Sequence, residues 1–149
     1  MSADGLYNRN ILRLAAMLRP DDRIVYPNAS AERRSSTCGS KIAVDITLDQ
    51  HGHISATAFR AKACALGQAS AAQLQNMAVG KDRIAITEMR FALAACLQEG
   101  KEIPESFSQL DAFAVARGFP ARYGAILLPY DALLAAMDMA VQQKLEVKG

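Results

Sequence analysis

Residues 41–49, KIAVDITLD, alternate between apolar and polar side chains. The apolar set is Ile42, Val44, Ile46 and Leu48, and the opposite face carries Asp45, Thr47 and Asp49. A period of two is typical of a strand with one buried face. Gln50-His51-Gly52 follows as a three-residue hairpin loop, with Gly52 at the position that needs a positive φ. The stretch 53–63, HISATAFRAKA, is then the returning strand of an antiparallel hairpin.

Helical patterns lie on both sides of this hairpin. Residues 6–18 place apolar side chains on one stripe that ends before Pro20, and 21–35 form a loop or an irregular edge strand. Further helices are expected at 66–79, 83–98, 107–117 and 126–145, with Pro129 tolerable only near the first turn of the last. The order predicts one α+β domain over residues 1–149, with a small, mainly antiparallel sheet and helices on one face.

Composition narrows the class of protein. The chain has 149 residues, 51% of them hydrophobic, which is enough for a full core. A formal charge of +2 without a basic run argues against a nucleic-acid partner. No segment is expected to span a membrane and no signal peptide is evident. Three widely spaced cysteines do not form a disulfide framework, so we expect a cytoplasmic protein with reduced thiols.

The hairpin register brings two distant cysteines together. If the loop is centred on His51, the numbers of opposing residues sum to 102, and Cys38 falls opposite Cys64. Directly opposed strand residues have Cβ atoms about 4.5–5.5 Å apart. Both cysteines share the parity of the apolar face, and a bulge at Gly39 would shift this pairing by one residue. Cys64 also stands at the start of a helix, whose free N–H groups favour a thiolate.

Two interpretations of this pair remain open. Two thiolates at one end of a sheet suit a soft metal or the handling of sulfur. Alternatively, they are small hydrophobic residues buried at a strand end. The third cysteine, Cys96, lies in an apolar helix and is expected in the core. The residue types alone do not decide between the two interpretations.

Several segments resemble the iron–sulfur cluster scaffold family of NifU/IscU type, and its SufU-like branch most closely. In family order they are LYNRNIL at 6–12, STCGSKI at 36–42, KACALGQASAAQ at 62–73, VGK at 79–81 and LDAFAVARGFPARYGAILLPYDAL at 110–133. The resemblance implies a SufU/IscU-like fold and no enzymatic turnover. It implies a protein that receives sulfur from a cysteine desulfurase and assembles or relays a cluster. In the SufU-like branch zinc binds at the same place.

The family site uses three cysteines and one aspartate. By resemblance Cys38 and Cys64 match two of the cysteines, Ser40 falls where the aspartate is expected, and Ala125 falls where the third cysteine is expected. Zinc or a [2Fe–2S] cluster needs four ligands. A serine hydroxyl is too weakly acidic and alanine supplies nothing. An iron–sulfur cluster or zinc would therefore need completion by a partner or by a second chain, as in a Cys₄ site across a homodimer.

Other polar residues near this site carry weaker signals. Arg122 matches a basic position beside the family site, where it either steadies a thiolate or persulfide or is a solvated loop residue. Tyr123 and Tyr130 are expected to fill space left by lost ligands. His53 lies eleven residues from Cys64, about 36 Å along an extended strand, so it cannot complete the site. Ser70 has no histidine within reach, which excludes triad chemistry.

Two functions follow as hypotheses. The first is a scaffold-like protein of iron–sulfur cluster assembly that handles sulfur or iron through Cys38 and Cys64. The second is a ligand-depleted paralogue that docks on or regulates a cysteine desulfurase or another assembly protein. An enzyme with Cys64 as nucleophile is disfavoured because no base lies within reach.

Overall fold

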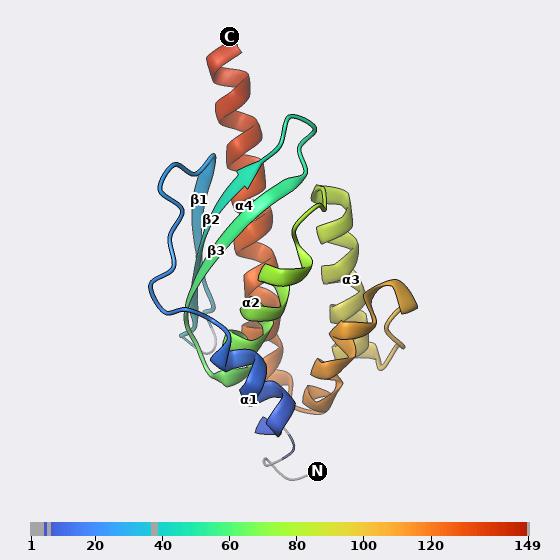
Figure 1. Ribbon diagram of the computed structural model, residues 1–149. Helices are drawn as coiled ribbons and strands as arrows, with labels where there is room; N and C mark the ends of the chain where they lie inside the picture. Colours follow the sequence, from blue (N-terminus) through green and yellow to red (C-terminus); the bar gives the residue numbers. More distant parts are fainter. Residues whose placement is uncertain (1–4, 6, 37–38, 149) are drawn as a thin grey trace.

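A three-stranded antiparallel sheet with helices against one face forms the protein (Figure 1). The computed structural model describes residues 5, 7–36 and 39–148. The strands are β1 (Ala29–Arg34), β2 (Lys41–Leu48) and β3 (Ile54–Lys62), and they lie in the order β1-β2-β3. The α-helices are α1 (Arg9–Ala16), α2 (Ala65–Met77), α3 (Arg83–Glu99) and α4 (Tyr123–Lys148), and the 3₁₀ segments include η2 (Glu105–Ala116) and η3 (Pro120–Arg122). The predicted α+β class, with a small antiparallel sheet and helices on one face, is confirmed.

The core lies between the sheet and two of the helices. α4 crosses β1 and β2, α2 packs beside β3 and against α4, and α3 packs on the far side of α4 (Figure 1). The predicted apolar face of β2 is fully buried there, as Ile42, Val44 and Ile46 are each 0% exposed. Burial of about 25 cal/mol for each Å² of apolar surface makes this face the main source of stability.

The hairpin contains a bulge that the sequence prediction missed. Leu48 pairs with Ile54 as expected, but the register shifts between Thr47 and Leu48. Between Thr47 and Lys41 the numbers of two opposing residues sum to 103 and not to 102. The buried residue opposite Val44 is therefore Phe59 and not residue 58. The register of 102 that opposed Cys38 to Cys64 is therefore wrong for this part of the ladder. Cys38 itself lies outside the described residues.

The last helix differs from the prediction at its start. It begins at Tyr123, three residues earlier than expected, so Pro129 lies inside it and not in its first turn. Proline has no N–H, so the carbonyl of Ala125 loses its helical hydrogen bond. The carbonyl of the following residue, Ile126, accepts a 2.6 Å hydrogen bond from the Ser70 hydroxyl. Ser70 thus joins α2 to α4, which gives it a structural role. The segment predicted as a helix over 107–117 is the 3₁₀ helix η2.

Gly67 allows this close approach of α2 to α4. A Cβ at this position would lie 2.7 Å from the Ala63 Cβ and 3.3 Å from the Ala125 carbonyl oxygen. Gly67→Ala is therefore expected to destabilise the protein by about 1–3 kcal/mol, although the same change in an open helix stabilises it by about 1 kcal/mol. Urea unfolding measures the change, with Asn76→Ala on the exposed side of α2 as the control. A stabilised Gly67→Ala variant would contradict this packing.

The outer face of the sheet carries a buried carboxylate. Asp45 was expected on a solvated face, yet it is 0% exposed because the segment before β1 covers it. Its oxygens accept hydrogen bonds from Arg60, Arg23, Ser30 and the Ile24 backbone N–H, at 2.7–3.2 Å. Burial alone would raise the pKa of Asp45, but these hydrogen bonds and the charge of Arg60 outweigh it and lower the pKa to about 2.

One segment is long and apolar enough to cross a membrane, which the sequence analysis did not expect. It runs from Pro120 to Leu145 and is mostly α4. Within its most apolar window, 61% of the residues are buried inside the protein. This is the pattern of a core helix, and the packing of α4 on the sheet accounts for its composition.

Candidate functional site

Cys64 stands at the junction between β3 and α2. Its backbone is extended (φ −64°, ψ 170°), and it occupies the N-cap position of the helix. The thiol is free and half-buried, and it makes no capping hydrogen bond. The first turn of α2 contains no acidic residue. The positive end of the helix dipole is therefore not neutralised by a side chain of its own first turn.

Gln68 fixes the local geometry around Cys64. Its side-chain amide donates to the carbonyl of Ala63 at 2.9 Å, and its backbone N–H donates to the carbonyl of Cys64 at 3.0 Å. The chain therefore turns from strand to helix with both flanking carbonyls satisfied. The glutamine of the QAS segment thus holds the Cys64 backbone in place.

Three separate segments converge on a pocket of about 290 Å³ beside Cys64. One segment precedes β2, one follows β3, and one includes η3 and the start of α4. The lining residues are Gly39, Ser40, Lys62, Ala63, Cys64, Ala121, Arg122 and Ala125. The structure thus brings together four predicted residues that span 86 positions of sequence, from Ser40 to Ala125. Cys38, the fifth, is outside the described residues.

The segment after η2 positions Arg122. Pro120 begins the single 3₁₀ turn η3, and the Arg122 N–H donates to the Phe119 carbonyl at 2.9 Å. The hydroxyl of Tyr123 accepts a hydrogen bond from the Gly118 N–H at 3.0 Å, which closes the preceding turn. Tyr123 therefore orders this turn through a hydrogen bond, a role that the space-filling prediction did not include.

The donor atoms that the structure describes in this pocket do not fit a metal ion. Ser40 and Ala125 are buried, at 5% and 1% exposed, and neither supplies a strong ligand. Across residues 5, 7–36 and 39–148, no group of three or more His, Cys, Asp or Glu residues is placed to hold a metal. Zinc and iron–sulfur clusters need four donors, mostly thiolate or imidazole. The residues seen here supply one thiol.

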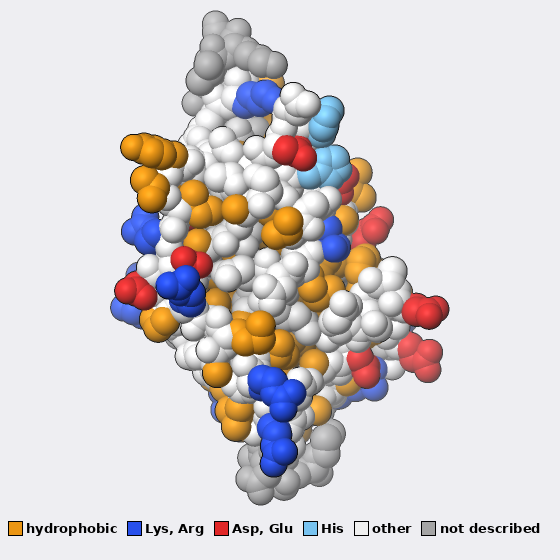
Figure 2. Space-filling model, in the orientation of Figure 1, with side chains coloured by type: hydrophobic (Ala, Val, Ile, Leu, Met, Phe, Trp, Pro, Cys, Tyr) orange, Lys and Arg blue, Asp and Glu red, His pale blue; other side chains and the backbone are white. Residues whose placement is uncertain are grey.

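The remaining cysteine and the histidines lie elsewhere. Cys96 is fully buried in α3, as predicted, and its sulfur accepts a 3.1 Å hydrogen bond from Arg117. His51 and His53 belong to the hairpin loop, and the pale blue histidine side chains in Figure 2 lie at the hairpin end of the molecule. β3 separates that end from Cys64, so neither histidine completes the pocket.

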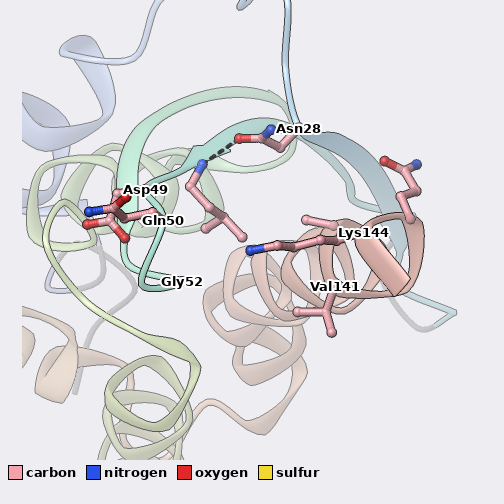
Figure 3. A pocket seen from close by; sticks show the side chains of 9 residues that line it. Asn28, Asp49, Gln50, Gly52, Val141 and Lys144 are labelled. Carbon is pink, nitrogen blue, oxygen red and sulfur yellow. Dashed lines mark hydrogen bonds between the residues drawn. The ribbon is translucent and has the colours of Figure 1, made fainter. Parts of the chain in front are cut away.

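A second hollow, shown in Figure 3, occupies the hairpin end. It lies between the hairpin loop and the last turns of α4, and the residues labelled there include Asn28, Asp49 and Lys144. Asn28 accepts the N–H of Leu48 at 2.7 Å, which ties the loop before β1 to β2. This hollow has no cysteine in its lining, so we do not connect it with sulfur chemistry.

Sequence reasoning missed one residue of the Cys64 pocket. Lys62 is the last residue of β3 and lines the pocket two residues before Cys64. A lysine at a strand end is common at a solvated edge, so nothing in the sequence marked it.

Comparison with solved structures gives the same fold. The N-terminal part of a nitrogen-fixing NifU-like protein from Brucella abortus matches with a TM-score of 0.85 and 29% identity, over 93% of this chain and 96% of that one. A protein assigned as the iron–sulfur cluster assembly scaffold of the SUF system in Fervidobacterium islandicum matches with a TM-score of 0.81 and 22% identity, over 91% and 99%. No family model matches the chain, and no curated protein matches its sequence.

Proposed function

We propose that this chain, which has the fold of the NifU-like and SufU iron–sulfur cluster scaffold proteins, serves cluster assembly by accepting and holding sulfur on Cys64. The supporting observation is the pocket that places a free, half-buried thiol beside Arg122 and the uncapped start of α2. Sulfur transfer needs one thiolate and no metal. The donor set therefore suits this role although it does not suit zinc or a cluster.

The proposed step is an exchange of sulfur between two thiols. The Cys64 thiolate attacks the terminal sulfur of a persulfide on a cysteine desulfurase. A new S–S bond forms on Cys64, the S–S bond of the donor breaks, and the donor cysteine leaves as a thiolate. No net oxidation or reduction occurs. The N-terminus of α2 stabilises the negative charge at Cys64 before and after transfer.

Cys38 is the second sulfur in this proposal. It precedes Gly39 and Ser40, which both line the pocket. By its place in the chain we assign it to the same site, either to hold the persulfide in turn or to pass it to the next protein. The partner class is a cysteine desulfurase or another protein of cluster assembly.

Intact-mass measurement tests this proposal. The protein is incubated without oxygen with a cysteine desulfurase and cysteine, and its mass is then recorded under non-reducing conditions. We expect the addition of one sulfur atom, absent in Cys64→Ser and retained in the control Cys96→Ala. Retention of the added sulfur in Cys64→Ser, or no added sulfur in the natural chain, would overturn the proposal.

The buried Ser40 and Ala125 favour one alternative, a docking protein that has lost its chemistry. In that case the surface around the pocket would still bind an assembly protein, and the thiols would be incidental. The double variant Cys38→Ser/Cys64→Ser separates the two functions. If it keeps both the partner in a pull-down and the role in the cell, the docking function is correct and sulfur transfer is not.

A further inference from the structure

The pocket beside Cys64 is positively charged. Of the eight described residues that line it, Lys62 and Arg122 carry a positive charge and none carries a carboxylate. The position where the family resemblance places an aspartate holds Ser40 instead. The uncapped N-terminus of α2 adds a partial positive charge on the same side. All fixed charges in the described lining therefore have one sign.

The guanidinium of Arg122 has no hydrogen-bonding or ionic partner among the residues that the structure describes. Four arginines of the described chain are half-buried: Arg60, Arg90, Arg117 and Arg122. Arg60 binds Asp45, Arg90 binds Asp131, and Arg117 binds a sulfur and two carbonyls. Among the residues that the structure describes, only Arg122 of these four makes no side-chain hydrogen bond. A half-buried guanidinium without a partner has donors available for a ligand.

Lys62 shows the same contrast with its neighbour across the sheet. Lys41 pairs with Lys62 in the ladder and forms an ion pair with Glu32 at 3.2 Å. Within the described part of the chain, Lys62 has no carboxylate partner, although it stands beside the pocket. The two lysines differ in this way because Glu32 lies on β1, on the far side of Lys41.

We infer that this pocket is an anion site, built to hold a compact anionic sulfur group against Cys64 and not a divalent cation. A planar guanidinium gives two parallel hydrogen bonds to an anion, and Lys62 adds a second positive charge to the lining. The ligand class is a small sulfur anion, either the terminal sulfur of a Cys64 persulfide or a free sulfane such as thiosulfate. The inference rests on the proposed function for the source of this sulfur, but its test needs no desulfurase.

The donor set of the pocket disfavours a metal ion. A zinc or iron ion gains its affinity from anionic ligands. The family ligand set is strongly anionic, whereas the described lining of this pocket holds one thiol and two cations. The presence of Ser40 and Ala125 in place of the aspartate and the third cysteine therefore changes the preferred ligand of the pocket from a cation to an anion.

Titration with sodium thiosulfate at low ionic strength tests the inference, with amide NMR as the readout and sodium chloride as the ionic-strength control. We expect saturable shifts at the N–H groups of residues 64–67 and 121–125. Arg122→Gln should weaken thiosulfate binding by about tenfold or more, because it removes a charged hydrogen-bond donor. Arg122→Lys should retain part of the affinity, because it keeps the charge but not the bidentate geometry.

Lys144→Gln is the matched control, because it makes the same change of charge at the hairpin end of the molecule (Figure 3). It should leave the thiosulfate affinity unchanged. Three results would overturn the inference: no saturable shift, an equal loss of affinity in Lys144→Gln and Arg122→Gln, or stoichiometric zinc binding at residues 64–67 of the natural chain. Each of these three results can be obtained whether or not the chain accepts sulfur from a desulfurase, so this test is separate from the test of the proposed function.

Discussion

Replacing Asp45 by alanine is expected to cost about 3 kcal/mol of stability, because it leaves the half-buried guanidinium of Arg60 without its carboxylate partner. Asp45 is 0% exposed, and Arg60 donates two hydrogen bonds to its oxygens at 3.1 and 3.2 Å. Arg60 also donates to the Asp22 carbonyl, so the same change loosens the segment that covers this face of the sheet. Urea unfolding at neutral pH measures the loss.

Asp138→Ala is the matched control for Asp45→Ala. Asp138 pairs with Arg83 at 2.6 Å, but both side chains are more than half exposed. An exposed ion pair contributes at most about 1 kcal/mol, so this variant should unfold close to the natural protein. Equal losses from the two variants would show that the outer-face network around Asp45 does not hold the fold together.

The contribution of Asp45 should also depend on pH. Its pKa in the folded protein, about 2, is below the ordinary value of 3.8. Its stabilising effect is therefore complete above about pH 5 and is lost as the pH falls through about 2, a total change of about 2–3 kcal/mol at 1.4 kcal/mol per pKa unit. The difference in unfolding free energy between the natural protein and Asp45→Asn should narrow over this range.

Restoring the missing ligands should convert the Cys64 pocket into a zinc site. Ser40 and Ala125 both line that pocket, so Ser40→Asp with Ala125→Cys adds a carboxylate and a thiolate beside Cys64. With free zinc at a thousand times Kd, binding linkage adds about 4 kcal/mol to stability. For a chain of this size, this raises Tm by roughly 8–16 °C. Calorimetric unfolding with and without zinc, together with metal analysis, measures the gain.

Ser40→Asp with Ala125→Ser is the control, because it matches the size of the double variant without the second thiolate. It should show little or no zinc-dependent rise in Tm. A folded Ser40→Asp/Ala125→Cys protein that ignores zinc would show that positions 40 and 125 do not face the Cys64 sulfur.

The hairpin and the strand–helix junction could be predicted because their signals are local. Alternation over 41–49 identified β2, and the glycine at 52, which has φ 80°, identified the loop. The helix predicted over 83–98 agrees with α3 to within a residue, and it is capped by the Asp82 side chain and ended by the left-handed Gly100. The junction at Cys64 followed from the change of period, whereas the convergence of Ser40, Arg122 and Ala125 on one pocket was implied only by the family resemblance.

Features that depend on distant contacts were not predictable. Because of the bulge, the buried side chains of β3 change from even-numbered positions at Ile54 to odd-numbered positions at Phe59, and the small alanines between them fit either face. The only sign of this change in the sequence is that Ile54 and Phe59 are separated by an odd number of positions. The burial of Asp45 depends on a loop with no periodicity. That Arg122 has no partner within the described part of the chain is visible only in three dimensions.

The most direct test of the central claim is to measure how much sulfane sulfur and how much metal each chain carries. The protein is purified from its own cells without oxygen, an affinity tag or a chelator. We expect sulfane sulfur on Cys64, removable by a reductant, and less than stoichiometric zinc or iron. A colourless chain with one tightly held zinc, or a coloured chain with a cluster, and no sulfane sulfur in either case, would contradict it.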